Sequence, residues 1–285
     1  AIEFRGFPPK ARDDLVKALG NRIRVQESDW NCNLMFSTNH ARKPFTDARV
    51  RRAMTLAVDR WGGSKYLSQI AIVRAVGGIV FPKHPLAATK KELHQLAGYW
   101  PDIKKSRAAA RKLLKDAGVK KGHKFIFNNR AVDQPYKVVG TWLLDQWKQI
   151  GLAGKQEVKP TGPFFASLRK KKDWDASIDF NCQAIVNPLA DLSKFQSDDI
   201  AGNNYGVYKD RQVDKWYDQI ARETDLAKQR ALVRKYEKRI LEEEAHIGVT
   251  LWWYKINPHR SYVKGWKIAP SHYLNQSLEQ VWLDK

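Results

Sequence analysis

Residues 43–60 read KPFTDARVRRAMTLAVDR, and this stretch carries the clearest structural signal in the chain. Its apolar residues recur at the spacing of one helix face: Val50, Ala53, Met54, Ala57 and Val58. Thr46 follows a Pro-Phe pair and is in position to cap the start of this helix. The pattern predicts an amphipathic helix whose apolar stripe lies in a core. The charged residues at its ends, Arg49, Arg51 and Asp59, are expected to tie the helix to neighbouring elements through charge-assisted hydrogen bonds.

Helical and extended patterns alternate on both sides of this stretch. Further helices are predicted over 8–20, 106–118, 136–150, 163–171, 211–223 and 225–244, with Ser106 and Thr224 as the caps of two of them. Strands are predicted over 22–27, 33–38, 125–127, 155–159, 174–181 and 247–254. This alternation predicts the α/β class, with a mixed sheet flanked by helices and without an internal repeat.

The chain is strongly basic. Its 51 Lys and Arg against 30 Asp and Glu give a formal net charge of +21. Such a balance permits binding to nucleic acid, to an anionic membrane or to an acidic solute, and it selects none of them. No apolar run reaches the roughly 18 residues of a membrane span. The first residues lack the pattern of a signal peptide, so a secreted origin implies that a signal segment has been removed.

Motifs of catalysis and metal binding are missing from the sequence. There is no serine-nucleophile elbow, no HExxH pair and no phosphate-binding loop of the Walker type. The seven histidines are scattered, and the two cysteines are far apart, so neither type supplies a clustered metal site. The acidic run 242–244 lies on a helix, where consecutive side chains point to different faces. We therefore expect neither an enzyme nor a bound cofactor or metal.

The 43–60 stretch resembles the signature of the periplasmic solute-binding proteins of the oligopeptide, dipeptide and nickel class, which serve ABC importers. Their pattern runs Pro-Phe, then Asp-x-Arg-Val-Arg, then Ala-(Ile/Val)-Asp-Arg, and this sequence keeps nearly all of it. Thr38–Asn39 before the motif, and Asn203–Asn204 leading to Tyr208 after it, agree in order. The resemblance implies the fold of a periplasmic-binding-protein lobe, a small solute as ligand and the membrane permease of an ABC importer as partner.

Members of this class are considerably longer than this chain and consist of two lobes. By resemblance, residues 1–31 are the tail of the first lobe, residues 32–258 form the second lobe, and residues 259–285 return to the first lobe. The resemblance implies a periplasmic monomer whose signal peptide and most of whose first lobe lie outside this chain. Its two lobes would close around a solute, which favours the closed state because only that state contacts it from both sides.

The resemblance also implies the binding residues. Asn181 and Gln183 would face the solute from the loop that contains Cys182 and Ala184. In peptide-binding members an acidic residue at the position of Ala184 holds the amino group of the ligand, so this anchor is missing here. Arg5 falls on a first-lobe position that faces the ligand, where it would favour an acidic or phosphate-bearing solute. A surface ion pair is the alternative role for Arg5.

The same resemblance implies a disulfide between Cys32 and Cys182, because some peptide-binding members carry bridged cysteines at both positions and the periplasm is oxidising. The alternative is two free, buried cysteines.

A basic module that binds nucleic acid or an anionic surface is the rival hypothesis, and it rests on the net charge alone. Phosphate-backbone binding weakens steeply with salt, whereas a site for an uncharged solute does not. No nucleic-acid-binding motif accompanies the charge, so we expect no nucleic acid partner.

Overall fold

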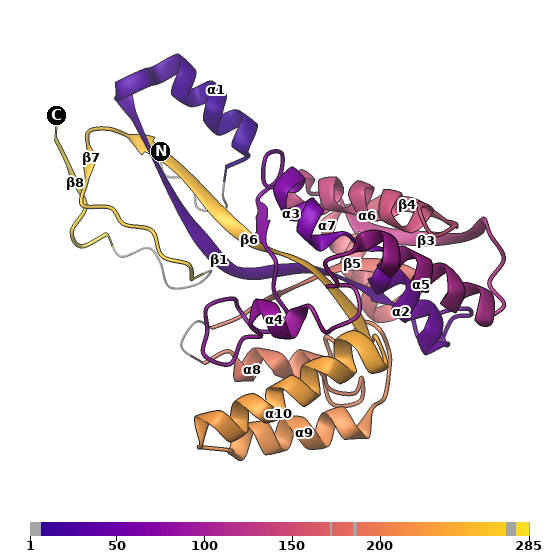
Figure 1. The fold of residues 1–285 in the computed structure, drawn as a ribbon. Coiled ribbons are helices and arrows are strands. Elements are labelled where there is room, and N and C mark those ends of the chain that lie inside the picture. Colours follow the sequence, from indigo (N-terminus) through magenta and orange to yellow (C-terminus); the bar gives the residue numbers. More distant parts are fainter. Residues whose placement is uncertain (1–6, 172, 185–186, 272–277, 285) are drawn as a thin grey trace.

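The computed structural model describes residues 7–171, 173–184, 187–271 and 278–284. A six-stranded sheet with the order β2-β6-β1-β5-β3-β4 forms its centre (Figure 1). The strands are β1 (Ile23–Thr38), β2 (Val73–Ala75), β3 (His123–Arg130), β4 (Leu152–Lys159), β5 (Ala176–Cys182) and β6 (Ile247–Arg260). β3 runs parallel to β4 and β5, whereas β1 is antiparallel to β5 and β6. The predicted α/β class with a mixed sheet is confirmed.

Helices cover both faces of this sheet. They are α1 (Pro9–Leu19), α2 (Ala48–Ala57), α3 (Arg60–Leu67), α4 (Lys90–Leu93), α5 (Ile103–Asp116), α6 (Val138–Lys148), α7 (Thr161–Ala166), α8 (Leu189–Leu192), α9 (Arg211–Arg222) and α10 (Leu226–Lys238). Alternate residues of β1 point to opposite faces, so Leu34 and Phe36 join a cluster with α2, α5 and α6, while Met35 joins a second cluster with α9 and α10. A short pair, β7 (Val263–Lys264) and β8 (Trp282–Leu283), lies apart from the main sheet.

The 43–60 stretch contains α2, and a second helix, α3, begins at its last residue, Arg60. α2 begins one residue later than predicted, because Asp47 and not Thr46 caps it by accepting a hydrogen bond from the Arg49 backbone N–H at 2.8 Å. Its apolar stripe is fully buried, as predicted. Asp59 then caps α3, a helix that the pattern did not predict, by accepting from the Gly62 backbone N–H at 2.8 Å.

The arginines of α2 tie it to distant elements, as expected from their charge. Arg49 donates to the Asp116 carbonyl at 2.9 Å, and Arg51 donates to the Glu244 carbonyl at 3.0 Å. These bonds fix the helix against the end of α5 and against the turn before β6. In this fold the charged residues of the 43–60 motif therefore hold α2 in place.

Two further predicted caps are wrong, and in both cases, as in α2, an aspartate caps the helix instead. The cap of α5 is Asp102, whose carboxylate accepts hydrogen bonds from the Lys104 and Lys105 backbone N–H groups. The cap of α10 is Asp225 instead of Thr224. An aspartate near the start reaches the free N–H groups of the first turn and adds a favourable charge. Ser106 instead lies inside α5 and donates to the Leu56 carbonyl at 2.7 Å.

The two short strands predicted at 22–27 and 33–38 are one 16-residue strand, β1. Its partner β6 continues from the strand predicted at 247–254 into the extended run predicted to follow it, and it ends at Arg260. Residues 23–29 of β1 pair with residues 254–260 of β6, and among the described strands this half of the pair has no further neighbour. Figure 1 shows this two-stranded arm leaving the sheet toward α1, β7 and β8. The bulge between Asp29 and Asn33 in the pairing explains why the sequence reads as two strands.

Arg60 joins three elements inside the core. Its side chain is 1% exposed, and its guanidinium lies 4.4 Å from the ring centroid of Tyr99. It donates to the carbonyls of Val249 in β6 and Gly98, both at 2.6 Å. Burial lowers the pKa of Arg60. The buried charge is therefore balanced by carbonyl oxygens and an aromatic face.

We expect Arg60→Met to lower the free energy of unfolding by roughly 3 kcal/mol, because the carbonyls of Val249 and Gly98 lose a buried donor. The control is Arg49→Met, since Arg49 lies in the same motif but its side chain is 50% exposed. That change should cost much less than Arg60→Met, because an exposed ion pair contributes little to stability. Denaturant titrations of both variants provide the comparison, and equal losses would contradict the role assigned to Arg60.

A cluster of aromatic and charged groups lies at the start of β6. The rings of Tyr208 and His246 stack with centroids 3.8 Å apart, and the ring of His40 lies 5.2 Å from each. His246 Nε2 is 2.9 Å from an Asp210 carboxylate oxygen that also accepts from Arg239 at 2.6 Å. Burial lowers the pKa of His246, while Asp210 opposes this effect.

The pKa of His40 lies well below its ordinary value, chiefly because of burial and secondly because of the Arg51 charge. His40 therefore stays neutral in the folded state while the unfolded chain takes up a proton below about pH 6.5. The free energy of unfolding therefore decreases as the pH falls through that value. Above it, the neutral His40 makes its full contribution to stability.

The variant His40→Gln should flatten this dependence. Between pH 7.5 and 5.5 we expect its free energy of unfolding to fall by roughly 1 kcal/mol less than that of the wild type, because one proton-uptake site is absent from the unfolded variant. Other titrating groups, including His246 and Asp210, are shared and cancel in the difference. Equal pH dependence of the two proteins would contradict the assignment.

Candidate functional site

A disulfide anchors the loop that follows β5. Cys32 of β1 faces Cys182 of β5 in the strand register, and their sulfur atoms are 2.03 Å apart. The predicted pairing of the two cysteines is confirmed. Just beyond the bond, the Gln183 backbone N–H donates to the Asn31 carbonyl at 2.8 Å, and the Asn31 side chain donates back to the Gln183 carbonyl. The start of the loop is thus held against β1 by a covalent bond and two hydrogen bonds.

Gln183 uses its side chain within the protein. The residue has 0% exposure, its amide oxygen accepts from the Phe81 backbone N–H at 2.9 Å, and its amide nitrogen donates to the Ile79 carbonyl at 2.6 Å. These bonds fix the 79–81 segment beside the end of β5. In this arrangement both ends of the Gln183 amide bond to backbone groups of a segment about a hundred residues away in the sequence, so the side chain positions the loop. That Gln183 also faces the solute stays a prediction.

Asn181 and Ala184 flank this anchor. Asn181 is 7% exposed and its amide nitrogen is 3.4 Å from the Asp191 carbonyl oxygen. Ala184 is exposed, and its backbone N–H donates to the Asp191 carboxylate at 2.7 Å. Burial raises the pKa of Asp191. A partly buried carboxylate from α8 therefore lies next to the position at which the sequence carries alanine.

Asparagines of β1 complete the polar group. Asn33 lies opposite Asn181 in the strand register, has 0% exposure, and neither atom of its amide has a hydrogen-bond partner. Asn31 and Asn33 alternate with Cys32 and Leu34, so the amides occupy the face of β1 opposite to Cys32. This alternation of amides with apolar residues is the signal by which the sequence could have revealed them.

The segment after β6 returns to the same place. Lys255 is 1% exposed, and its ammonium group donates to the carbonyls of Ala269 and Ser271 at 3.1 and 2.5 Å. Burial lowers the pKa of Lys255 to about 8. The Asn31 backbone N–H also donates to the Pro270 carbonyl at 3.1 Å. Residues 269–271 are thus fixed beside β1, close to the anchored loop.

Charged side chains line the neighbouring part of β1. The Asp29 carboxylate contacts the Lys83 ammonium group and lies 3.3 Å from Arg74 Nη2. These cations outweigh the effect of burial and lower the pKa of Asp29. The structure therefore brings residues 181–184 together with segments from β1, the 79–83 loop and residues 269–271. Arg5, the remaining predicted ligand residue, lies outside the described residues.

Family comparison identifies the kind of protein. Residues 5–203 match the family model described as "Bacterial extracellular solute-binding proteins, family 5 Middle". The chain belongs to this family. The resemblance of the 43–60 motif is thereby confirmed, and the family consists of solute-binding proteins and not of enzymes.

Similar proteins agree with this assignment. The chain is 27% identical over 268 residues to "Di/tripeptide-binding protein 1" of Pseudomonas aeruginosa, covering 92% of this chain and 48% of that protein. Among solved structures, the fold matches the periplasmic binding protein DppA of Helicobacter pylori in complex with the peptide STSA, with a TM-score of 0.78, 21% identity, and coverage of 98% of this chain and 52% of that one. It also matches the murein tripeptide binding protein MppA of Escherichia coli, with a TM-score of 0.81, 16% identity, and coverage of 98% and 53%. The chain thus spans about half the length of these relatives.

Two further findings concern the described part of this family 5 chain. None of its helices is both long and apolar enough to cross a membrane. Among the same residues, no three His, Cys, Asp or Glu side chains come together in a way that suits a metal ion.

The disulfide should contribute strongly to stability. Because it joins residues 150 positions apart, we expect the double variant Cys32→Ala/Cys182→Ala to lose about 2–5 kcal/mol of unfolding free energy, chiefly through the larger freedom of its unfolded chain. Denaturant titration with and without reductant measures this. Reduced wild type should match the double variant, which itself should not respond to reductant. An unchanged midpoint on reduction would contradict the prediction.

Proposed function

We propose that this chain contains the second lobe of an ABC importer's substrate-binding component, which captures a small solute between two lobes and delivers it to the membrane permease. The solute is peptide-like or another polar or anionic small molecule. Family membership over residues 5–203 is the observation that carries this proposal. Structurally similar proteins described as periplasmic binding proteins support a periplasmic location. Nothing in the family favours the rival nucleic-acid-binding function.

The two-stranded arm supports the division into lobes proposed from the sequence. Residues 1–31, 32–258 and 259–285 are assigned to the tail of the first lobe, the second lobe and the return segment. β1 crosses the boundary between residues 31 and 32, β6 crosses that between 258 and 259, and the two strands form one antiparallel pair whose far half leaves the main sheet (Figure 1). A pair of strands that bends between two bodies is a suitable hinge, because a few backbone angles absorb the closing motion.

The ligand site in this proposal is the anchored loop at the end of β5. Ala184 is the exposed member, Asn181 lies beneath it, and Cys182 and Gln183 hold the loop in place. Arg5 would contribute from the first lobe. Fixing the loop before ligand arrives favours affinity, since less conformational freedom is lost on binding.

The test uses the full-length protein that contains this chain, titrated calorimetrically with a panel of di- and tripeptides and of small anionic solutes. Mass spectrometry of the compound that co-purifies with the protein supplements the panel. For a solute that binds, we expect Asn181→Ala and Arg5→Ala each to weaken affinity about tenfold, the loss of one hydrogen bond to the ligand.

Gln219→Ala is the matched control, because Gln219 is an exposed amide on α9 and no hydrogen bond in the described structure joins its side chain to residues 181–184. It should leave affinity unchanged. If no solute of these classes binds or co-purifies, the proposed function fails. If a solute binds equally well to the wild type and to both site variants, the assigned site fails and the function stands.

A further inference from the structure

A cationic hollow lies at the end of the sheet away from the anchored loop. It has a volume of about 820 Å³ and is formed by the C-terminal ends of α5 and α6 and by the turns that precede β3 and β4. Five cations line it, and no carboxylate does: Arg111, Lys115, Lys120, Lys121 and Lys148. We name this site the cationic hollow.

The charges of the cationic hollow are only partly offset within the described protein: Arg111 donates to the Gln149 carbonyl at 3.3 Å, and Lys115 lies in the field of Asp116. Asp116, the carboxylate nearest in sequence, pairs with Lys112 at 2.6 Å. Lys115 and Lys148 stand in the last turns of their helices, where a cation offsets the helix dipole. That role does not extend to Lys120 and Lys121, which follow the end of α5 and form no ion pair within the described residues. Converging, unpaired cations around a concavity raise the local concentration of anions.

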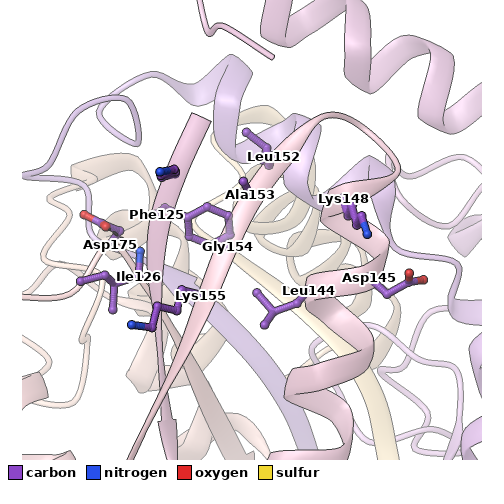
Figure 2. A pocket seen from close by; sticks show the side chains of 11 residues that line it. Phe125, Ile126, Leu144, Asp145, Lys148, Leu152, Ala153, Gly154, Lys155 and Asp175 are labelled. Carbon is purple, nitrogen blue, oxygen red and sulfur yellow. Dashed lines mark hydrogen bonds between the residues drawn. The ribbon is translucent and has the colours of Figure 1, made fainter. Parts of the chain in front are cut away.

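A largely apolar hollow adjoins the cationic one and shares Lys148 with it. Its volume is about 750 Å³. The carboxylates of Asp145 and Asp175 also line it, and Asp175 accepts a hydrogen bond from Arg42 at 2.7 Å. Figure 2 shows Leu144 and Lys148 on the α6 side, with Phe125 across from them and Gly154 on the β4 ribbon between. A side chain at Gly154 has no room, because a Cβ atom there would lie 2.5 Å from atoms of both Leu144 and Phe125. The glycine therefore lets helix and strands approach closely and leaves the groove beside them without an extra side chain.

We propose that the two hollows together bind one anionic, single-chain amphiphile, such as a monomeric lysophospholipid. Its phosphate group lies among the cations, and its hydrocarbon chain lies along Leu144, Ile126 and Ala153, the apolar lining residues that are not buried. A multiply anionic solute alone would leave the apolar hollow empty, and a neutral hydrocarbon would leave Lys120 and Lys121 without an anionic partner. A molecule with both an anionic group and a hydrocarbon chain can occupy both hollows at once, with Lys148 at the junction between them.

This site is separate from the proposed solute site. β3 and β5 run parallel, with Phe127 opposite Ala176. The hollows lie at the N-terminal ends of β3 and β4, whereas the anchored loop follows the C-terminal end of β5. Binding at one site is therefore testable without the other.

The experiment measures binding by calorimetry, at low ionic strength, to the full-length protein. The probe is lauroyl lysophosphatidylglycerol below its micelle-forming concentration. Lauroyl lysophosphatidylcholine has the same chain with a zwitterionic head, and glycerol 3-phosphate is an anionic head without the chain. We expect the anionic amphiphile to bind at least about tenfold more tightly than either of these. Vesicles of phosphatidylcholine with phosphatidylglycerol distinguish a membrane surface from a single lipid molecule.

Two variants address the two hollows separately. Lys120→Glu/Lys121→Glu reverses charge in the cationic hollow, and Ala153→Glu places a charge in the apolar one, where Ala153 is exposed. Each should weaken binding of the probe at least about tenfold. The matched control is Lys215→Glu/Lys228→Glu, two exposed lysines on α9 and α10 that make no ion pair in the described structure, and it should bind like the wild type. Circular dichroism and thermal melts establish that each variant is folded.

Four results would overturn the proposal: equal binding of the zwitterionic lipid, equal binding of glycerol 3-phosphate, binding to anionic vesicles only, or a loss in the control variant as large as in the charge-reversed one. Peptide or solute binding at the anchored loop does not enter these outcomes, so failure here leaves the proposed function untouched.

Discussion

β1 is the strand on which the rest of the molecule depends, because it pairs with β6 on one side along most of its length and with β5 on the other. The alternation of its side chains divides the core into two clusters, one under α2, α5 and α6 and one under α9 and α10. A shift of one residue in its register would turn Leu34 and Phe36 away from the α2, α5 and α6 cluster and toward the opposite face of the sheet. The disulfide at Cys32 opposes such a shift, since it fixes the register of β1 against β5 covalently.

Buried polar groups connect elements that are far apart in the sequence. Arg60 joins α3 to β6, Gln183 joins the end of β5 to the 79–81 segment, and Lys255 fixes residues 269–271. Each group replaces its hydration with several backbone carbonyls or N–H groups, which is the condition for burying it without a large loss of stability. The same bonds give the loop after β5 a defined shape before any ligand is present.

The two ends of the sheet have different chemical character. At the end of β5, amides and a partly buried carboxylate gather around a rigid loop. At the start of β3 and β4, lysines and an apolar groove are exposed together. The high positive charge of the chain, which on composition alone selects no partner, is thus concentrated in part at a surface away from the proposed solute site.

The sequence by itself determined the class of the fold, the buried stripe of α2 and, through its resemblance to a known family, the pairing of Cys32 with Cys182. These features depend on local periodicity or on a short motif, which a single sequence contains in full. The caps at Asp47 and Asp102 were missed because several polar residues near each helix start compete, and the tertiary position of the helix selects among them. The length of β1 was missed because its polar residues around the bulge break the alternation.

Only the tertiary structure decided what the residues of the candidate site do. Gln183 and Asn181 have the same type of side chain and lie two positions apart, yet one is used fully by a segment a hundred residues away, and the other lies opposite an unpaired Asn33. The gathering of lysines from α5, α6 and the turn between α5 and β3 is likewise invisible in the linear order. In each case the decisive quantity is which distant backbone groups reach a side chain, and chain folding alone sets that distance.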